Sequence, residues 1–406
     1  MFTRYKSDEK GRRVAVAKVY TSKEHNIHNS QIDKDCLWAI RKMWSHGYKA
    51  YVVGGAVRDM ILGKRPKDFD IATSASPKQI QRLFWNSRII GKRFRIVHLF
   101  FAAKIIEVTT FRSDEENFEE GNNNIFGTIE QDARRRDFSI NALYYNPLDG
   151  HLLDFNNGLE DIRKKVIRSL IPLSYSFKED PVRMIRAVKY SCTTGFRLKW
   201  DVKRALKRDS SCLEHVSISR LTDEALKIFN SGCSCQVMLA LHKYNLLPFI
   251  LPGFEMYIKY SNVLSSLQEL DEKVMSAKSS GTSFTLADIL QIIARPVLVY
   301  DESHMSVSEL SHELFRQIKV FVAPLTPPNY EIEKAVDLIL AQDGLKTVSI
   351  QKRKNAPSRK KNAAASARSQ RYKYKNSRKK KDNAKASSGQ PADISQAASS
   401  AEAHDL

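Results

Sequence analysis

Apolar residues between positions 32 and 63 recur at spacings that predict two helices separated by a strand. Ile32–His46 has helical spacing and ends at Gly47, a residue that favours helix termination. Tyr51–Val53 is a short β-type run that stops at Gly54-Gly55. Val57–Leu62 then predicts a second helix, again followed by a glycine. The predicted order is therefore helix, strand, glycine pair and helix.

The following segments alternate between strand and helix signals up to residue 110. Asp68–Ile71 alternates polar and apolar positions, as a half-buried strand does. Pro77–Trp85 predicts a helix with proline in its first turn and a serine before it as the cap. Two β-rich runs, Phe94–Phe101 and Ile105–Thr110, predict a hairpin.

From Tyr175 onward the strand signals fade and helical periodicity takes over. The predicted helices are Pro181–Cys192, Val202–Lys207, Ile218–Asn230, Cys235–Tyr244, Leu286–Ile293, Val307–Phe321 and Tyr330–Ala341. The C-terminal residues are rich in Ala, Ser, Lys and Arg without an apolar period, which is typical of disorder. The pattern therefore predicts the α+β class, with a mixed α/β head and an all-helical body.

We expect five parts along the chain. They are a polar, loosely ordered N-terminal arm (1–30), the head (31–172), a helical neck (173–250), a helical body (251–347) and a disordered basic tail (348–406). A chain of 406 residues is long enough for such a division into packed domains.

Net charge gives the first indication of a partner. The formal charge is +21, and such an excess of bases favours polyanions. Between Gln351 and Lys385, fifteen Lys and Arg residues stand against one acid, Asp382. Because the folded part is also basic, we expect a polyanion along the helical body and a second basic element in the tail.

The five cysteines are odd in number and lack the paired spacing of a zinc site. They are interpreted as free thiols in a reducing compartment. No apolar run approaches the ~18–20 residues that span a bilayer, and the first residues lack the apolar core of a secretory signal. We therefore expect a cytoplasmic protein without membrane contact.

The strongest chemical signal is a glycine pair followed by two aspartates. Gly54-Gly55 lets the backbone approach a ligand and leaves N–H groups at a helix start, which attract anions. Arg58 can donate to phosphate oxygens. Asp68 and Asp70, at i and i+2 on the predicted strand, share a face and can hold Mg²⁺ beside those phosphates. Each piece alone is usually a turn or a solvated strand edge, but their ordered combination favours a nucleotide site.

Glu107 lies inside the apolar run Ile105–Val108. A charge in such a strand is costly unless it is paired or metal-bound. One interpretation is a third metal-binding carboxylate, and the other is a salt bridge to Arg93 or Arg95. The sequence leaves both open.

Several blocks, in this order, resemble the class II nucleotidyltransferase superfamily, which contains bacterial poly(A) polymerases and CCA-adding tRNA enzymes. YVVGGAVRDMILGKRPKDFDIAT (Tyr51–Thr73) resembles its metal-binding motif, RRRDFSINALYY (Arg134–Tyr145) its second motif, and FKEDPVRMIRAVKY (Phe177–Tyr190) its base-selecting neck motif. IIGKRFRIVHLFF (Ile89–Phe101) and NNIFGTIEQDARRRDF (Asn123–Phe138) resemble the bacterial poly(A) polymerase I branch more than the CCA-adding branch.

This resemblance implies a small mixed-sheet head of the polymerase β type with four catalytic acids. Asp68 and Asp70 correspond to ligands of two Mg²⁺ ions, with Mn²⁺ as an alternative, and Glu107 to a third carboxylate. Asp137 corresponds to an acid that acts through the ribose hydroxyls, although a salt-bridged carboxylate of low pKa is the plainer interpretation. The implied nucleotide-binding residues are Gly54, Gly55, Arg58, Arg136, Asn141, Asp180, Arg183 and Arg186.

In the neck motif, Glu179, Arg183 and Arg186 follow helical spacing and share a face. Such a pattern is ordinarily a solvated salt-bridge stripe. The resemblance implies instead that Asp180 and the arginines read the Watson–Crick edge of the incoming base. The implied reaction is attack of an RNA 3′-OH on the α-phosphorus of ATP with two metal ions, which lengthens the RNA by AMP.

Three alternatives remain beside an AMP-adding enzyme. A CCA-adding enzyme would use CTP and ATP with the same head residues. A non-catalytic RNA-binding protein would be expected to have lost Asp68, Asp70 or Arg58, and all three are present. A nucleotidyltransferase acting on a protein or small molecule is disfavoured by the basic charge of the folded part as a whole and by the neck motif.

The tail carries three basic clusters with Tyr372 and Tyr374 interleaved, a mixture that favours RNA tethering over mere solubility. The clusters are Lys352-Arg353-Lys354, Arg359-Lys360-Lys361 and Arg378-Lys379-Lys380-Lys381. The expected partners are ATP, RNA 3′ ends and RNA-decay proteins, and the expected state is a monomer. Trp200, His242 and Tyr244 are interpreted as core or surface residues rather than base-stacking platforms.

Overall fold

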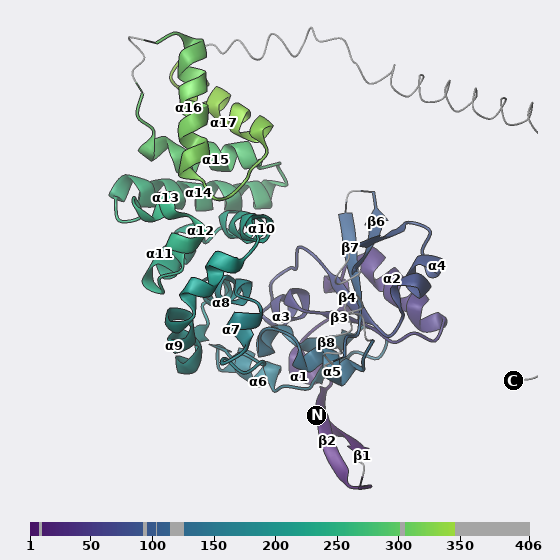
Figure 1. Cartoon of the computed structure of the whole chain (residues 1–406). Coiled ribbons are helices and arrows are strands. Elements are labelled where there is room, and N and C mark those ends of the chain that lie inside the picture. The colour runs from purple at the N-terminus through teal and green to yellow at the C-terminus, as the bar shows by residue number, and fades with distance from the viewer. Residues whose placement is uncertain (8–9, 92–95, 103, 114–125, 301–304, 346–406) are drawn as a thin grey trace, which may run out of the picture. The chain divides into compact units, whose positions relative to one another are not determined.

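The computed structural model describes residues 1–7, 10–91, 96–102, 104–113, 126–300 and 305–345 (Figure 1). The chain divides into two units, Met1–Lys346 and Thr347–Leu406, and the second lies outside the described residues. The prediction of a disordered basic tail with RNA-binding clusters therefore falls outside them as well.

Within the described residues, a nine-stranded mixed sheet forms the centre of the head. Its strands cross in the order β1-β2-β9-β8-β3-β4-β7-β6-β5. β4 and β7 run parallel, whereas the other neighbouring strands are antiparallel. The bounds are β1 (Phe2–Ser7), β2 (Arg13–Tyr20), β3 (Ala50–Val53), β4 (Asp70–Thr73), β5 (Ser87–Ile90), β6 (Ile96–Phe101), β7 (Lys104–Thr110), β8 (Leu143–Asn146) and β9 (His151–Asp154). This sheet confirms the α+β class. With nine strands, it is larger than the small mixed sheet that the family resemblance implies.

The three predicted helices of the head, α2, α3 and α4, bury apolar residues and contact strands of the sheet. α2 starts where the carboxylate of Asp33 accepts the backbone N–H groups of Asp35 and Cys36, and it buries Ile40 and Met43. Ser76 caps α4 in the same way. The bounds are α1 (Ser22–His25), α2 (Lys34–Ser45), α3 (Gly55–Ile61), α4 (Pro77–Leu83), α5 (Ile129–Arg134) and α6 (Gly158–Arg163).

The N-terminal segment is a β-hairpin that extends the sheet, so the expectation of a loosely ordered arm is wrong. β1 pairs with β2, and the end of β2 at Lys18–Tyr20 pairs with β9. Nearly all of β1 and the first half of β2 are exposed. A strand with both faces in water shows no polar–apolar alternation, which is why the sequence pattern does not reveal it.

Beyond residue 175 the described chain is almost wholly helical, as predicted. The seven predicted helices all appear, with ends that differ from the prediction by no more than two residues. A short parallel pair, β10 (Val166–Ile167) and β11 (Arg197–Leu198), links the head to this region. The bounds are α7 (Ser176–Glu179), α8 (Val182–Thr194), α9 (Trp200–Arg208), α10 (Ile218–Phe229), α11 (Ser234–Lys243), α12 (Leu247–Ile250), α13 (Pro252–Glu255), α14 (Ser261–Ser280), α15 (Leu286–Ala294), α16 (Val307–Phe321) and α17 (Asn329–Gln342).

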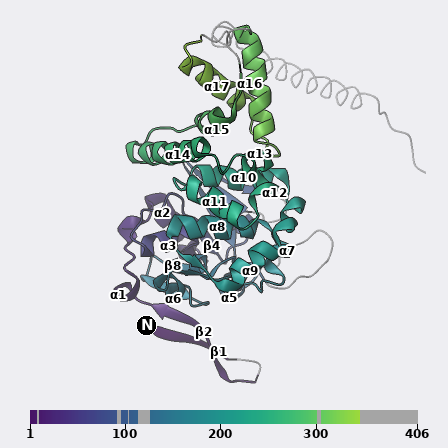
Figure 2. The ribbon, with the colours of Figure 1, turned by 90° about the vertical axis from the view of Figure 1, so that its left-hand side faces the viewer.

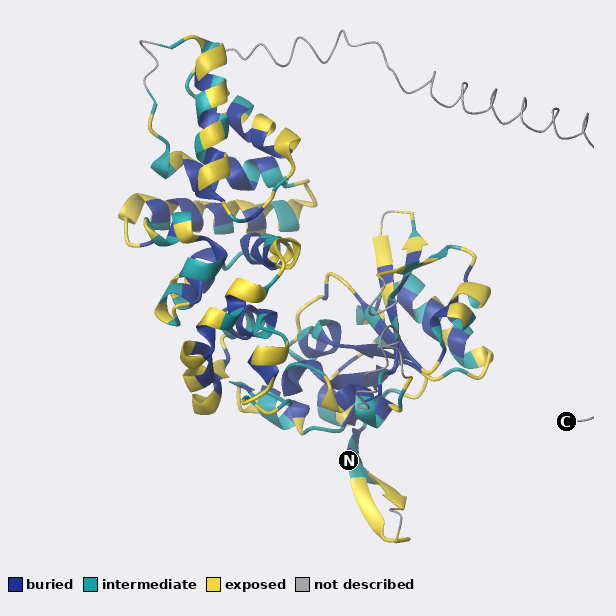
Figure 3. Ribbon diagram, in the orientation of Figure 1, coloured by how far each residue is buried: buried dark blue, intermediate teal, exposed yellow. Residues whose placement is uncertain are grey.

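The neck and body helices pack in succession along the chain. α8 packs against α10 and α11, and α11 packs against α14 (Figure 2). Buried residues line the inner faces of these helices while exposed residues cover the outer faces (Figure 3). Within the described residues, the structure contains no helix that combines the length and the apolar character needed to cross a bilayer.

Candidate active site

The glycine pair at the end of β3 forms a tight turn into α3. Gly54 adopts φ 74° and ψ −140°, a backbone conformation that side chains rarely allow. A Cβ atom on Gly54 would lie 3.5 Å from Oδ2 of Asp70 and 3.7 Å from Nη1 of Arg136. Glycine at this position therefore keeps open the space between a carboxylate and a guanidinium.

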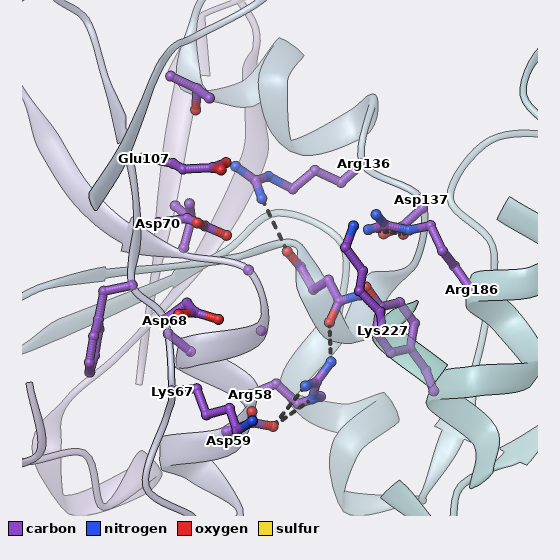
Figure 4. Close-up of a pocket in the computed structure, with 18 of the residues that line it drawn as sticks. Arg58, Asp59, Lys67, Asp68, Asp70, Glu107, Arg136, Asp137, Arg186 and Lys227 are labelled. Atoms are coloured by element: carbon purple, nitrogen blue, oxygen red, sulfur yellow. Dashed lines mark hydrogen bonds and ion pairs between the residues drawn. The ribbon is translucent and has the colours of Figure 1, made fainter. Parts of the chain in front are cut away.

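Asp70 and Glu107 are paired neighbours on the parallel strands β4 and β7, so their side chains point to the same face of the sheet. Asp68 does not lie on this strand, and the prediction of a strand from Asp68 to Ile71 is wrong at its start. The pairing between β3 and β4 begins with Val53, the last residue of β3, opposite Asp70, the first residue of β4. The chain leaves the sheet after Val53, at Gly54, so no residue of β3 lies opposite Asp68. All three carboxylates still line one side of the pocket (Figure 4).

The electrostatic environment of Asp70 is dominated by burial and like charges. Burial is the largest cause that raises the pKa of Asp70 to about 6, the charge of Glu107 is the second, and Asp68 adds to it. Arg136 acts in the opposite direction without reversing the shift. Burial and the two neighbouring carboxylates together disfavour the ionised form of Asp70.

Glu107 is half exposed on β7, and its Oε1 atom lies 3.5 Å from Nε2 of His98 on β6. This histidine was not among the predicted partners. Arg93 and Arg95 lie outside the described residues. The alternative that Glu107 is neutralised by one of these arginines therefore stays untested.

Arg58 is buried at the start of α3 and held by several partners. Its Nε and Nη2 atoms donate to Oδ1 of Asp59 at 2.9 and 2.8 Å, and Nη1 donates to Oδ1 of Asn141 at 2.7 Å. The guanidinium also lies 5.2 Å from the ring centroid of Tyr190. The structure thus brings Arg58 and Asn141 together, as the nucleotide-site prediction requires.

Arg136 is fixed by two residues that the sequence analysis missed. Its Nε atom donates to the hydroxyl of Tyr144 at 2.9 Å, and Nη2 lies 3.2 Å from Oδ2 of Asp132. The Tyr144 hydroxyl donates to the same carboxylate oxygen at 2.5 Å. In Figure 4, Arg136 extends toward the carboxylate side of the pocket. A tyrosine inside an apolar strand carries no sequence signal for such a role.

Asp137 forms a two-point ion pair with Arg186, which comes from α8 in the neck. Nε and Nη2 of Arg186 lie 2.8 and 2.7 Å from Oδ2 of Asp137, and the Phe138 N–H donates to Oδ1. Burial raises the pKa of Asp137, but the charge of Arg186 and these hydrogen bonds outweigh it, so the pKa is lowered. The plainer expectation of a salt-bridged acid is met, with a distant arginine rather than an adjacent one as the partner.

The neck motif is split between two helices, so the expectation of one continuous helical face is wrong. Glu179 ends α7, and Asp180 follows it outside α8, because Pro181 interrupts the backbone hydrogen bonding. Arg183 on α8 still pairs with Glu179 at 2.5 Å. Both oxygens of Asp180 accept from Nη2 of Arg220 on α10, at 2.9 and 3.1 Å.

A buried ion cluster that the sequence analysis missed joins α8 to α10. Nζ of Lys189 lies 2.6 Å from Oε2 of Glu224, and Nζ of Lys227 lies 3.0 Å from Oε1. Lys189 and Glu224 are both buried. The positions of these three residues along α8 and α10 would also fit ordinary exposed side chains. The sequence alone therefore does not reveal the cluster, which becomes visible only when the two helices pack together.

These groups line one cleft between the head and the neck with a volume of about 1920 Å³. Nucleotide-sized pockets occupy roughly 300–1,000 Å³, so the cleft has room for a nucleotide and part of a second ligand. Among the described residues, no three or more His, Cys, Asp or Glu side chains are grouped closely enough to hold a metal ion by themselves.

Comparison with known proteins identifies the family. Residues 50–168 match the model described as "Poly A polymerase head domain", and residues 195–258 match "Probable RNA and SrmB- binding site of polymerase A". Poly(A) polymerase I of Salmonella typhi is 32% identical over 327 residues, which cover 73% of this chain and 70% of that protein. The chain belongs to the poly(A) polymerase family.

Two further comparisons show how much of this chain and of its relatives is matched. Poly(A) polymerase I of Escherichia coli O6:H1 is 37% identical over 270 residues, which cover 63% of this chain. The chain spans 58% of the length of that relative. The crystal structure of the Bacillus stearothermophilus CCA-adding enzyme in complex with CTP has a TM-score of 0.53 at 23% identity and covers 77% of this chain and 83% of that one. This likeness shows that the two chains share a fold.

The family's two matched regions correspond to the two sides of the cleft. The head region includes Gly54, Asp70, Glu107 and Asn141, whereas the second region includes Arg220 and Glu224. The neck residues Asp180, Arg183 and Arg186 lie between the two matched regions.

Proposed function

We propose that this chain is a template-independent polynucleotide adenylyltransferase that adds AMP from ATP to RNA 3′ ends. Membership of the poly(A) polymerase family supports this proposal. The observation that carries it is the meeting of head and neck in one cleft, where carboxylates and guanidinium groups face each other. A triphosphate with a divalent cation matches such a site, because its charge complements both sides.

The carboxylates fit a divalent cation. Burial first, and then the charges of Glu107 and Asp68, raise the pKa of Asp70, and a bound cation would stabilise its ionised form. The described residues form no closed cage of three or more ligands. That arrangement suits Mg²⁺, which keeps several waters and binds through one or two carboxylates together with substrate phosphates. We assign Asp68 and Asp70 as ligands, with Glu107 beside them.

We assign different roles in the reaction to the side chains of the cleft. Arg58 and Arg136, each fixed by neutral and acidic partners, hold phosphate oxygens and stabilise the charge that develops there. Asp137, fixed by Arg186, offers a carboxylate oxygen to the ribose hydroxyls. Two Mg²⁺ ions, when bound, lower the pKa of the RNA 3′-OH and stabilise the departing pyrophosphate.

In the reaction, a bond forms between the RNA 3′ oxygen and the α-phosphorus of ATP. The bond from that phosphorus to the β-phosphate bridging oxygen breaks, pyrophosphate leaves, and the hydroxyl proton passes to solvent. The cleft holds both reactants close together, which removes much of the entropic barrier to this step.

Base selection is assigned to the neck. Asp180 accepts from the exocyclic amino group of adenine, and Arg183 donates to a ring nitrogen. Arg220 acts as a positioning residue, because it holds the Asp180 carboxylate through both oxygens. A base that leaves these groups unpaired loses binding free energy, since buried polar groups without partners are unfavourable.

A CCA-adding enzyme is the second candidate function, because the chain shares its fold with an enzyme of that name in complex with CTP. Cytosine also carries an exocyclic amino group, so Asp180 and Arg183 alone do not separate the two functions. The relative named poly(A) polymerase I is 32% identical over 73% of this chain, whereas the CCA-adding enzyme structure is 23% identical, so the sequence comparison favours AMP addition.

The deciding experiment extends two labelled primers, oligo(A) and a tRNA without its terminal CCA. Each primer receives ATP alone, CTP alone or both, with Mg²⁺ and separately with Mn²⁺. We expect long products on oligo(A) with ATP alone. Products of three nucleotides on the tRNA that require CTP would replace this proposal with the CCA-adding one.

Partners and location follow from the same proposal. The substrates would be ATP and RNA 3′ ends of mRNA, tRNA or other transcripts, and RNA-decay proteins are the expected protein partners. We propose a monomer that acts in the cytoplasm. The five cysteines, which form no disulfide bond with one another, agree with a reducing compartment.

A further inference from the structure

Helix α9 presents a tryptophan and three cations to solvent. The side chain of Trp200, the first residue of the helix, is 71% exposed. On the opposite side α9 buries Val202, Ala205 and Leu206. The helix therefore packs through its apolar face and does not need the indole for folding.

The exposed residues form a stripe, which we call the α9 stripe: Trp200, Lys203, Arg204 and Lys207. These positions differ by three and four residues, so they lie on one face of the helix. In Figure 3 the outer side of α9 is exposed along its length. Large aromatic side chains exposed to this degree are unfavourable in water and often mark binding surfaces.

The cations of the α9 stripe are not balanced by acids. The bases at the two ends of the helix have acidic neighbours, since Lys199, the residue before α9, lies 3.8 Å from Asp201 and Arg208 lies 2.6 Å from Asp209. Within the described part of the chain, Lys203, Arg204 and Lys207 form no ion pair. The Arg204 guanidinium instead lies 5.5 Å from the centroid of the Trp200 ring.

The α9 stripe is separate from the catalytic cleft. The cleft is lined by residues of the head, the neck helices α8 and α10, and α14, and α9 contributes none of the lining among the described residues. The stripe therefore belongs to a different step from nucleotide selection. It lies inside the region that matches a probable RNA- and SrmB-binding model, although that match names no residue.

We propose that the α9 stripe binds single-stranded RNA upstream of the 3′ end that occupies the cleft. Lys203 and Lys207 contact phosphates, and a base stacks on Trp200 beside the Arg204 guanidinium. This assignment rests on the proposed function for the identity of the RNA. RNA is favoured over a protein partner because an exposed aromatic ring among unpaired cations matches bases and phosphates together.

The test measures RNA affinity of the full chain without nucleotide, over a range of salt concentrations, with a long oligo(A). Trp200→Ala should weaken binding about tenfold because a stacked base is lost, and Trp200→Phe should keep most of the affinity. Lys203→Gln with Lys207→Gln should reduce the slope of log Kd against log salt by about 1.4, since each phosphate contact to a single strand contributes about 0.7.

The controls separate this surface from general charge and from catalysis. Lys23→Gln with Lys34→Gln removes the same charge from exposed positions on α1 and α2 of the head, outside the lining of the cleft, and should leave affinity close to that of the natural chain. AMP addition to an oligo(A) too short to leave the cleft should be unchanged in the α9 variants. Natural affinity and salt slope in the α9 variants would overturn the proposal and assign the surface to a protein partner. A chain that binds RNA through Trp200 but adds no AMP would refute the proposed function alone.

Discussion

Asp70 differs from Asp137, another acid of the cleft with a shifted pKa, because the pKa of Asp70 is raised whereas that of Asp137 is lowered. The raised pKa means that ionised Asp70 is unfavourable in the folded chain until a cation binds. Asp137 has the opposite character, since Arg186 stabilises its ionised form. The two acids therefore have different tasks, cation binding for Asp70 and a fixed hydrogen-bond acceptor for Asp137.

Replacing Asp70 should separate activity from stability. Asp70→Asn removes a metal ligand and should lower AMP addition by at least the order of 10²-fold, as loss of one electrostatic group does in other active sites. It also removes an unfavourable charge, so the midpoint of thermal unfolding without metal should stay the same or rise. Primer extension and calorimetry measure the two effects. A fully active Asp70→Asn variant would refute the metal assignment.

His25 makes the stability of the head dependent on pH. It is buried, its Nδ1 atom accepts the N–H of Ile27, and Nε2 lies 3.0 Å from the carbonyl oxygen of Gly150. Both bonds are satisfied by the neutral ring alone. Burial is the main cause that lowers the pKa of His25, so the unfolded chain binds the proton more readily.

The sign of this linkage gives a prediction. Stability from His25 is complete above the ordinary histidine pKa of about 6.5 and is lost as the pH falls below it. Thermal unfolding followed between neutral and mildly acidic pH should show a decline that is smaller in His25→Gln. Parallel curves for the two proteins would show that another group controls the decline.

At the residue scale, the sequence predicts the side chains that form the site better than it predicts the partners that hold them in place. Gly54, Arg58, Asp68 and Asp70 lie within one short segment, and their types and order are enough to predict a phosphate and cation site. Arg220 lies forty residues beyond Asp180, and such a partner follows only from how the helices pack.

Helices and strands also differ in how far the sequence predicts them. Helices with a clear apolar stripe, such as α16, are predictable to the residue. α14 buries Val263, Leu267, Leu270 and Val274 at helical spacing, but its six serines favour caps and turns and mask the pattern. The N-terminal hairpin is hidden because its strands are stabilised by pairing rather than by a buried face.

The pairing of α8 with α10 depends on the buried cluster of Lys189, Glu224 and Lys227. Glu224→Gln would leave the buried ammonium of Lys189 without its partner, and should lower the free energy of unfolding by about 3–5 kcal/mol. The double variant Lys189→Met with Glu224→Leu removes both charges and should recover most of that loss. Chemical denaturation measures all three proteins. Equal losses in the single and double variants would show that the ion pair does not determine this packing.

For the whole molecule, charge is the property that extends beyond the cleft. The tail from 348 onward holds the densest basic clusters of the sequence, and the head and the neck also carry more bases than acids. The two regions should therefore contribute separately to RNA binding.

Truncation after Val348 tests this division. The shortened chain should add AMP to short primers at the natural rate, because the cleft is intact. Its affinity for long RNA should be lower and less dependent on salt, since each lost phosphate contact reduces the salt slope by about 0.7. Unchanged affinity and slope would mean that the tail only improves solubility.

The ion pair between Asp137 and Arg186 has a consequence for anyone who wishes to dissect this protein or borrow its parts. The acid belongs to the head and the arginine to the neck, 49 residues later in the chain. A head fragment cut before the neck would contain Asp68, Asp70, Glu107 and Asp137, yet it would leave Asp137 without its counter-charge and without the partner that orients it. The smallest working module is therefore the head together with the neck, and exchanging specificity between relatives requires moving both pieces as a unit.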